Sequence, residues 1–169
     1  MEEPWILKIM DVAQGKAKAD LIIKNAKVVN VFTKEIQDVD VAVAAGKIAW
    51  IGQDGEREAE IVYDAGGKYL IPGLIDGHSH IEMSFMSPIP FARTVLGHGT
   101  TAAILDMHDV CNAGINCMHS FAKEINQTPL KAFLMIPPCV PGTPDLEEAG
   151  ASMTLADVKK AMNLPQAWG

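Results

Sequence analysis

The chain has 169 residues and a formal net charge of −7, with 49% hydrophobic and 21% charged residues. This composition is typical of a globular protein and excludes disordered and coiled-coil chains. The acidic balance, without a basic stripe, argues against nucleic-acid binding. We expect no membrane association, because no uncharged run reaches the length of a spanning helix and the N-terminus lacks the basic start of a secretory signal. Three cysteines without a C-x-x-C spacing are typical of reduced thiols in a cytoplasmic protein: Cys111, Cys117 and Cys139.

Residues 1–68 are predicted to form a helix and a small β-sandwich. The segment from Trp5 to Ala13 has apolar residues at helical spacing. Five short runs rich in β-branched residues follow, separated by turn residues. These runs are residues 20–24, 27–32, 38–43, 47–51 and 60–64. Short, closely spaced strands favour an antiparallel arrangement, so we expect an antiparallel sandwich here.

Residues 69–169 change to an alternation of apolar strands and helices. The strands are predicted at 69–75, 100–105 and 130–136, and the helices at 88–97, 114–127 and after a capping box that begins at Thr154. Buried strands that alternate with helices favour a parallel sheet or a βα-barrel. We therefore expect an α/β protein, with the first three βα units of an incomplete TIM-like (β/α) barrel.

Two histidines follow the first of these strands. His78 and His80 are two positions apart, and such side chains point the same way on an extended chain. Neutral imidazole is a good ligand for Zn, Fe or Mn. An apolar strand has no structural use for histidines at its carboxyl end, where the sites of βα folds lie. The pattern therefore predicts that His78 and His80 bind a divalent metal ion.

The second apolar strand also ends in polar residues. Asp106, His108 and Asp109 follow it within four positions. A histidine beneath a loop can be purely structural, and for His108 alone that interpretation would be preferred. Two successive strands with histidine and carboxylate at their ends favour a common site. We therefore expect these three residues near the metal.

The run from Ile71 to His80, I-P-G-L-I-D-G-H-S-H, resembles the first barrel strand of the amidohydrolase superfamily. The pattern of that strand is P-G, two hydrophobic residues, then D-x-H-x-H. Further runs resemble the adenine deaminases within this superfamily, and together they extend from about Leu7 to Gly169. These runs are residues 11–15, 19–25, 28–32, 80–82, 91–93, 98–101 and 139–141.

The resemblance implies that His78 and His80 are metal ligands, and that the complete site is dinuclear with Mn, Fe or Zn. It also implies that Glu82 is a catalytic residue beside the metal or substrate, with His108 close to the site. No other cofactor is expected. The chain departs from the family pattern at Met83, where the family has serine, and at Asp109, where it has glutamate. These changes leave the histidine pair intact and alter loops on the substrate side.

The implied activity is hydrolytic deamination of adenine or a related purine, with release of ammonia. Two alternatives remain: another amidohydrolase activity, such as hydrolysis of a cyclic amide or an imidazolone, and a non-catalytic fragment or assembly subunit. The expected partners are a purine-like small molecule and either further copies of the chain or the remaining C-terminal part of the barrel. Because three βα units lack the later ligands of the family, we expect the isolated chain to be inactive.

Overall fold

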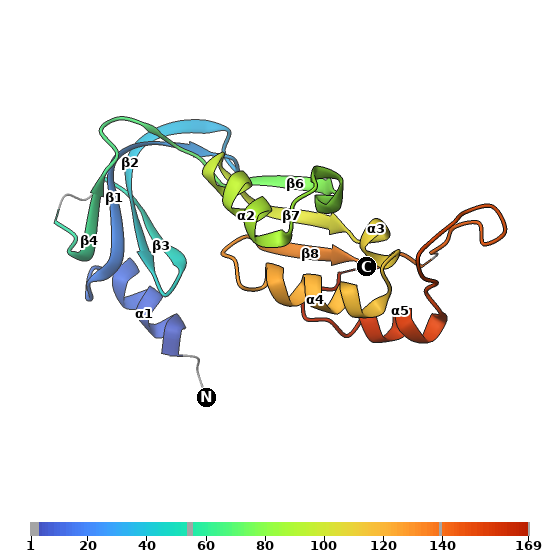
Figure 1. The fold of residues 1–169 in the computed structure, drawn as a ribbon. Helices are drawn as coiled ribbons and strands as arrows, with labels where there is room; N and C mark the ends of the chain where they lie inside the picture. Colours follow the sequence, from blue (N-terminus) through green and yellow to red (C-terminus); the bar gives the residue numbers. More distant parts are fainter. Residues whose placement is uncertain (1–3, 54–55, 139, 169) are drawn as a thin grey trace. The chain divides into compact units, whose positions relative to one another are not determined.

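The computed structural model describes residues 4–53, 56–138 and 140–168, and the expectation of a reduced thiol at Cys139 lies outside them. The chain divides into two compact units, of which the first ends at Pro72 and the second begins at Gly73 (Figure 1). Within the described residues, none of the helices has both the length and the apolar character that crossing a membrane requires.

The first unit contains one helix and one mixed sheet. Its strands run in the order β3-β2-β1-β4, with the short β5 also paired to β1. Strands β1 to β3 are antiparallel neighbours, whereas β4 and β5 are parallel to β1. The elements are α1 (Pro4–Ala13), β1 (Ala19–Asn30), β2 (Glu35–Ala44), β3 (Lys47–Gly52), β4 (Ala59–Asp64) and β5 (Tyr69–Leu70).

This sheet differs from the predicted antiparallel sandwich. Asn25 has a φ of 55°, and the ladder to β2 shifts between Ile23 and Ala26. The turn signal at Asn25 therefore makes a bulge within one long strand rather than a break between two strands. The antiparallel expectation is wrong for β4, because the path of a connection decides strand direction and local β-propensity does not encode it. The described strands of this unit form one sheet.

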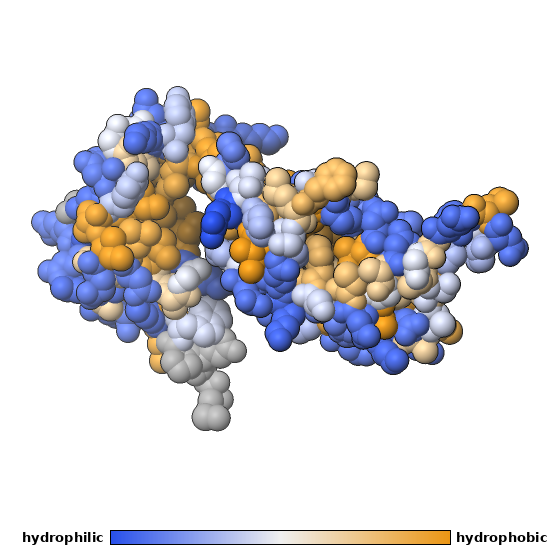
Figure 2. Space-filling model, in the orientation of Figure 1, coloured by the Kyte–Doolittle hydropathy of each residue, from blue (hydrophilic) through white to orange (hydrophobic). Residues whose placement is uncertain are grey.

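Helix α1 is fastened to the sheet at its C-terminal end. Val12 is buried with Ile22 of β1, and Ile9 packs against the same cluster. Arg57 donates hydrogen bonds to the carbonyl oxygens of Val12 and Ala13, and its guanidinium stacks 4.2 Å from the ring of Trp50. Other apolar side chains of this unit remain at the surface, where apolar residues gather in Figure 2.

The second unit is a three-stranded parallel sheet with helices. Its strands run in the order β6-β7-β8, and helices α2 and α4 pack against each other beside them (Figure 1). The predicted alternation of parallel strands and helices is confirmed. The elements are β6 (Leu74–Ser79), the 3₁₀ helix η1 (Ile81–Ser84), α2 (Pro88–Gly97), β7 (Thr100–Asp106), α3 (His108–Cys111), α4 (Ile115–Ile125), β8 (Lys131–Met135) and α5 (Leu155–Ala161).

The strand predicted at 69–75 is divided between the two units. Tyr69 and Leu70 pair with β1 of the first sheet, and the first strand of the second sheet begins only at Leu74. Pro72 cannot donate to a ladder. Gly73 lies so close to the Thr101 side chain that a Cβ there would overlap it. The chain therefore changes sheets at Pro72-Gly73, and His78 lies within β6 rather than beyond it.

The core of the second unit holds the carboxyl ends of its strands in place. Leu105 of β7 and Leu134 of β8 are fully buried with Met118 and Ile125 of α4. Ile81 of η1 belongs to the same cluster, which anchors the segment that follows β6. The predicted capping box is confirmed: Thr154 accepts a hydrogen bond from the Asp157 backbone N–H, and the Asp157 side chain accepts one from Thr154.

Candidate metal centre

The two predicted histidine ligands face each other at the carboxyl end of β6. His78 lies in the strand, and His80 is the residue that precedes η1. Their Nε2 atoms are 3.0 Å apart and their ring planes are inclined at 70°. Two imidazole ligands of one tetrahedral ion have nitrogens about 3.4 Å apart. The pair is therefore arranged as two ligands of a single ion would be.

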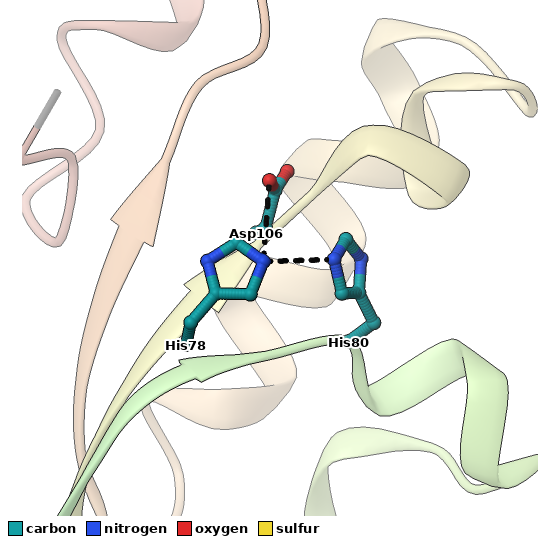
Figure 3. A group of neighbouring side chains, drawn as sticks. All are labelled: His78, His80 and Asp106. Atoms are coloured by element: carbon teal, nitrogen blue, oxygen red, sulfur yellow. Dashed lines mark hydrogen bonds and ion pairs between the residues drawn. The ribbon is translucent and has the colours of Figure 1, made fainter.

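A carboxylate from the neighbouring strand completes a group of three donors. Asp106, the last residue of β7, places Oδ2 3.9 Å from His78 Nε2 (Figure 3). The ligand atoms of His78, His80 and Asp106 all lie within 4.8 Å of one another. Because β6 and β7 are parallel neighbours, their carboxyl ends meet at the same edge of the sheet. Strand direction thus brings Asp106 to the histidine pair.

The other ring nitrogen of His80 faces two further carboxylates. His80 Nδ1 is 3.4 Å from Glu82 Oε1 and 3.8 Å from Asp109 Oδ2. Glu82 comes from η1, and Asp109 comes from α3 after β7. His80, Glu82 and Asp109 form a second group of potential ligands within 4.8 Å. His80 is therefore shared by both groups, one on each ring nitrogen.

His108 lies at the border of this cluster. Its Nδ1 is 3.9 Å from Asp109 Oδ1, and its backbone N–H donates to Asp106 Oδ1 at 3.0 Å. It belongs to neither group of three donors that the described residues form. The structure thus brings together five of the predicted site residues: His78, His80, Glu82, Asp106 and Asp109. His108 lies beside the Asp109 oxygen that does not face His80.

Burial changes the acid–base properties of two groups at this end of the sheet. Burial raises the pKa of the Glu82 carboxyl, and the charge of Asp109 acts in the same direction, whereas hydrogen bonding to His80 opposes it. Glu82 Oε2 is buried and has no hydrogen-bond partner among the described residues. Burial also raises the pKa of the Cys111 thiol to about 12, so this thiol is protonated and unreactive.

Sequence reasoning did not anticipate the short helix α3 or the contact of Asp109 with His80. The Asp-x-His spacing could have indicated that the chain turns after Asp106. Asp106 accepts from the N–H two residues on, and Asp76 accepts from the N–H of His78 in the same way. Such side-chain turns are typical of aspartate before a change of chain direction.

The donor set of the centre suits a divalent metal ion of intermediate softness. It combines imidazole nitrogens with carboxylate oxygens and includes no thiolate among the described donors. Nitrogen and oxygen donors of this kind bind Zn, Fe and Mn. Half-buried carboxylates around two imidazoles also supply the negative charge that a dication requires. The residues present therefore fit the predicted metal.

Comparison with known proteins places the second unit in one family. The model of the Amidohydrolase family matches residues 69–165, which include β6, β7, β8 and every residue of the candidate centre. The chain belongs to the amidohydrolase family.

Individual relatives are more specific. The chain is 38% identical over its whole length to adenine deaminase 3 of Rhizobium meliloti (strain 1021). It is 45% identical, over 89% of its length, to an adenine deaminase of Geobacillus kaustophilus (strain HTA426). The matches cover 30% and 26% of these two proteins, so the chain spans less than a third of the length of the curated relatives it matches. The resemblance to adenine deaminases is confirmed.

Solved structures agree on the fold. A crystal structure of an adenine deaminase matches with a TM-score of 0.58 and 22% identity, over 86% of this chain and 38% of that one. An N-acyl-D-glutamate deacylase from Bordetella bronchiseptica, complexed with zinc and a phosphonate inhibitor, matches with a TM-score of 0.59 and 17% identity. That match covers 88% of this chain and 35% of the deacylase. At these identities the likeness shows the fold alone, and it confirms the α/β class.

Proposed function

We propose that this chain is part of a metal-dependent aminohydrolase that deaminates adenine or a related purine and releases ammonia. The observation that carries the proposal is the convergence of His78, His80 and Asp106 at the carboxyl edge of a parallel sheet. The similarity to adenine deaminases along the whole chain supports the choice of substrate. Because the chain spans under a third of those relatives, the activity belongs to the complete protein.

Each residue of the centre has a proposed role. His78 and His80 hold the ion through Nε2, and Asp106 neutralises part of its charge. The bound ion would lower the pKa of a water molecule and so supply a nucleophile at neutral pH. Glu82 is the proposed catalytic acid–base: its Oε2 is buried without a hydrogen-bond partner among the described residues, and burial raises the pKa of its carboxyl.

Further features of the complete protein are proposed on the same basis. The complete centre is proposed to be dinuclear, with Mn, Fe or Zn, on the similarity to adenine deaminases. Leu74 and Ile75 of β6 are more than half exposed, which supports packing against a further part of the barrel or a second copy. Free thiols at Cys111 and Cys117 support a reducing, cytoplasmic location, and the proposed small-molecule partner is a purine.

The test is ammonia release by the full-length protein. Protein loaded with Mn²⁺, Fe²⁺ or Zn²⁺ is offered adenine, other aminopurines and a panel of cyclic amides and imidazolones. We expect turnover of adenine or a related aminopurine by wild type, and none by His78→Ala at equal concentration. Asp145→Ala, a change in an exposed loop, serves as the control.

The alternative hydrolytic activity has its own structural support. Met83 and Phe85, in the segment directly after His80, have exposed fractions of 69% and 100%. An apolar loop beside the site can select a different heterocycle. Turnover of a cyclic amide without any aminopurine would replace the adenine proposal, and a metal-loaded protein that turns over neither would favour the assembly role.

A further inference from the structure

His80 is the residue on which both donor groups depend. Its Nε2 faces His78, and its Nδ1 faces the two carboxylates of Glu82 and Asp109. By contrast, His78 Nδ1 has no hydrogen-bond partner among the described residues, and its side chain is 55% exposed against 31% for His80. The two histidines are therefore held in different ways.

The chemistry of imidazole connects the two sides of His80. A neutral ring that offers the Nε2 lone pair to a metal carries its hydrogen on Nδ1. A carboxylate that accepts this hydrogen fixes the tautomer and the ring orientation and makes Nε2 a stronger ligand. Of the described residues, only Glu82 and Asp109 place such an acceptor at His80 Nδ1.

The two carboxylates differ in how they are attached. Glu82 is two residues from His80 on the same segment, so it moves with the ring. Asp109 comes from α3, where Val110 and Cys111 are buried in the core of the second unit. A contact from Asp109 therefore ties His80 to α3, a different element of the second unit. His108 Nδ1, 3.9 Å from the other Asp109 oxygen, borders that carboxylate on its far side.

We propose that Asp109 is a positioning residue that accepts the Nδ1 hydrogen of His80 and holds the ring in its metal-binding tautomer. Glu82 is then available as the acid–base that exchanges a proton with the reacting atoms. The inference rests on the proposed function only in taking His78 and His80 as ligands. The separation of 3.8 Å between Asp109 Oδ2 and His80 Nδ1 is longer than a hydrogen bond, so the proposal requires it to shorten when an ion is bound; catalytic contacts are often long before ligand binding.

The experiment measures metal affinity directly. Full-length protein is titrated with Mn²⁺ against a chelator of known affinity, for wild type, Asp109→Ala, Asp109→Asn, Asp109→Glu and the control Asp145→Ala. We expect Asp109→Ala to weaken Mn²⁺ binding by about 10–100-fold. Asp109→Asn should be intermediate because it keeps an uncharged acceptor, and Asp109→Glu should recover most of the affinity. The control should bind as wild type does.

A second readout separates positioning from substrate contact. At saturating Mn²⁺, Asp109→Ala should keep the wild-type KM, and the visible spectrum of the Co²⁺-loaded variant should shift because the His80 ligand is reoriented. Unchanged Mn²⁺ affinity in Asp109→Ala, or a raised KM at full metal occupancy, would overturn the inference. If the alanine variant does not fold, Asp109→Asn decides the same question.

The outcome also separates this inference from the proposed function. A protein that releases no ammonia, but whose Mn²⁺ affinity falls in Asp109→Ala, would contradict the deaminase proposal and support the role of Asp109. If the protein deaminates adenine and its metal affinity is the same in wild type and Asp109→Ala, the deaminase proposal is supported and the role of Asp109 is contradicted.

Discussion

The two units of this chain use strands differently. In the first unit, antiparallel and parallel neighbours are mixed in one sheet, and polar residues of its strands bind one another: the Asn25 backbone N–H donates to Asp40, and the Asn25 side chain donates to Asp64. In the second unit, all three strands are parallel, and their carboxyl ends carry both potential metal-binding groups of the described residues. Parallel direction gathers the ends of successive strands at one edge, so polar residues distant in the chain meet there.

The units also differ in what their sheets leave uncovered. The first has an apolar groove of about 310 Å³, lined by strand residues such as Val28, Val41 and Ile48. The second encloses Leu105 and Leu134 fully between strands and helices, although Leu74 and Ile75 of β6 stay more than half exposed. Both units therefore leave apolar surface uncovered, whereas the potential metal-binding groups of the described residues lie in the second. The predictions below test this division.

The largest expected effect is loss of the metal. In the protein with both His78→Ala and His80→Ala, elemental analysis should find the divalent ion absent, because two of the three donors in the first group are removed. Changes to residues that support metal ligands reduce activity by about 10–100-fold, and removal of the ligands themselves should reduce it further. The first unit should keep its hydrogen-exchange protection. Unchanged metal content in this variant would place the metal elsewhere.

Glu82→Gln should abolish most of the activity while the metal is retained. General acid–base residues contribute about 10²–10⁴-fold, and glutamine cannot move a proton. Steady-state kinetics and metal analysis on the same sample check this expectation. If both metal content and activity fall together, Glu82 acts as a ligand rather than as the acid–base.

Core substitutions test whether the two units are stabilised separately. Leu134→Ala and Ile22→Ala each remove a fully buried side chain, one from each unit. Each should lower the free energy of unfolding by about 2–5 kcal/mol. Hydrogen exchange should lose protection only in the unit that carries the change. Equal loss in both units would show that they unfold as one.

Thr154→Ala should cost less, about 1 kcal/mol, since it removes one half of the capping box of α5. Thermal unfolding measures the loss. Thr154→Ser, which keeps the hydroxyl that accepts from the Asp157 N–H, is the matched control and should remain close to wild type. An equal loss in the serine variant would exclude the cap as the cause.

The smallest effect is a pH dependence in the first unit. Hydrogen bonds from Lys8 and from the Ala45 N–H hold the pKa of Asp20 below its ordinary value. Because the folded pKa is the lower one, this stabilisation is present above the unfolded-state pKa and is lost as pH falls through the folded one. Asp20→Asn should therefore lower the urea midpoint at pH 6 and have no effect at the acidic end. A difference that persists under acid would contradict the assignment.

Most of the second unit could be predicted from the sequence. Pro88 after Ser87 marked the start of α2, the Thr154 capping box marked α5, and apolar runs marked β7 and β8. These signals are local, because each depends on residues within one turn or one strand. The first unit was harder to predict. The composition of β4 suits a parallel and an antiparallel neighbour equally, so its direction could not be predicted.

The sequence by itself determined that His78 and His80 point the same way, since that follows from the alternation of side chains along an extended chain. Only the tertiary structure decided which carboxylates surround them. Asp106 reaches His78 because β6 and β7 are parallel neighbours, and Asp109 reaches His80 because α3, which follows β7, is held by Val110 and Cys111 in the core. These contacts join residues about 30 positions apart, and their geometry depends on strand pairing and core packing that no local pattern specifies.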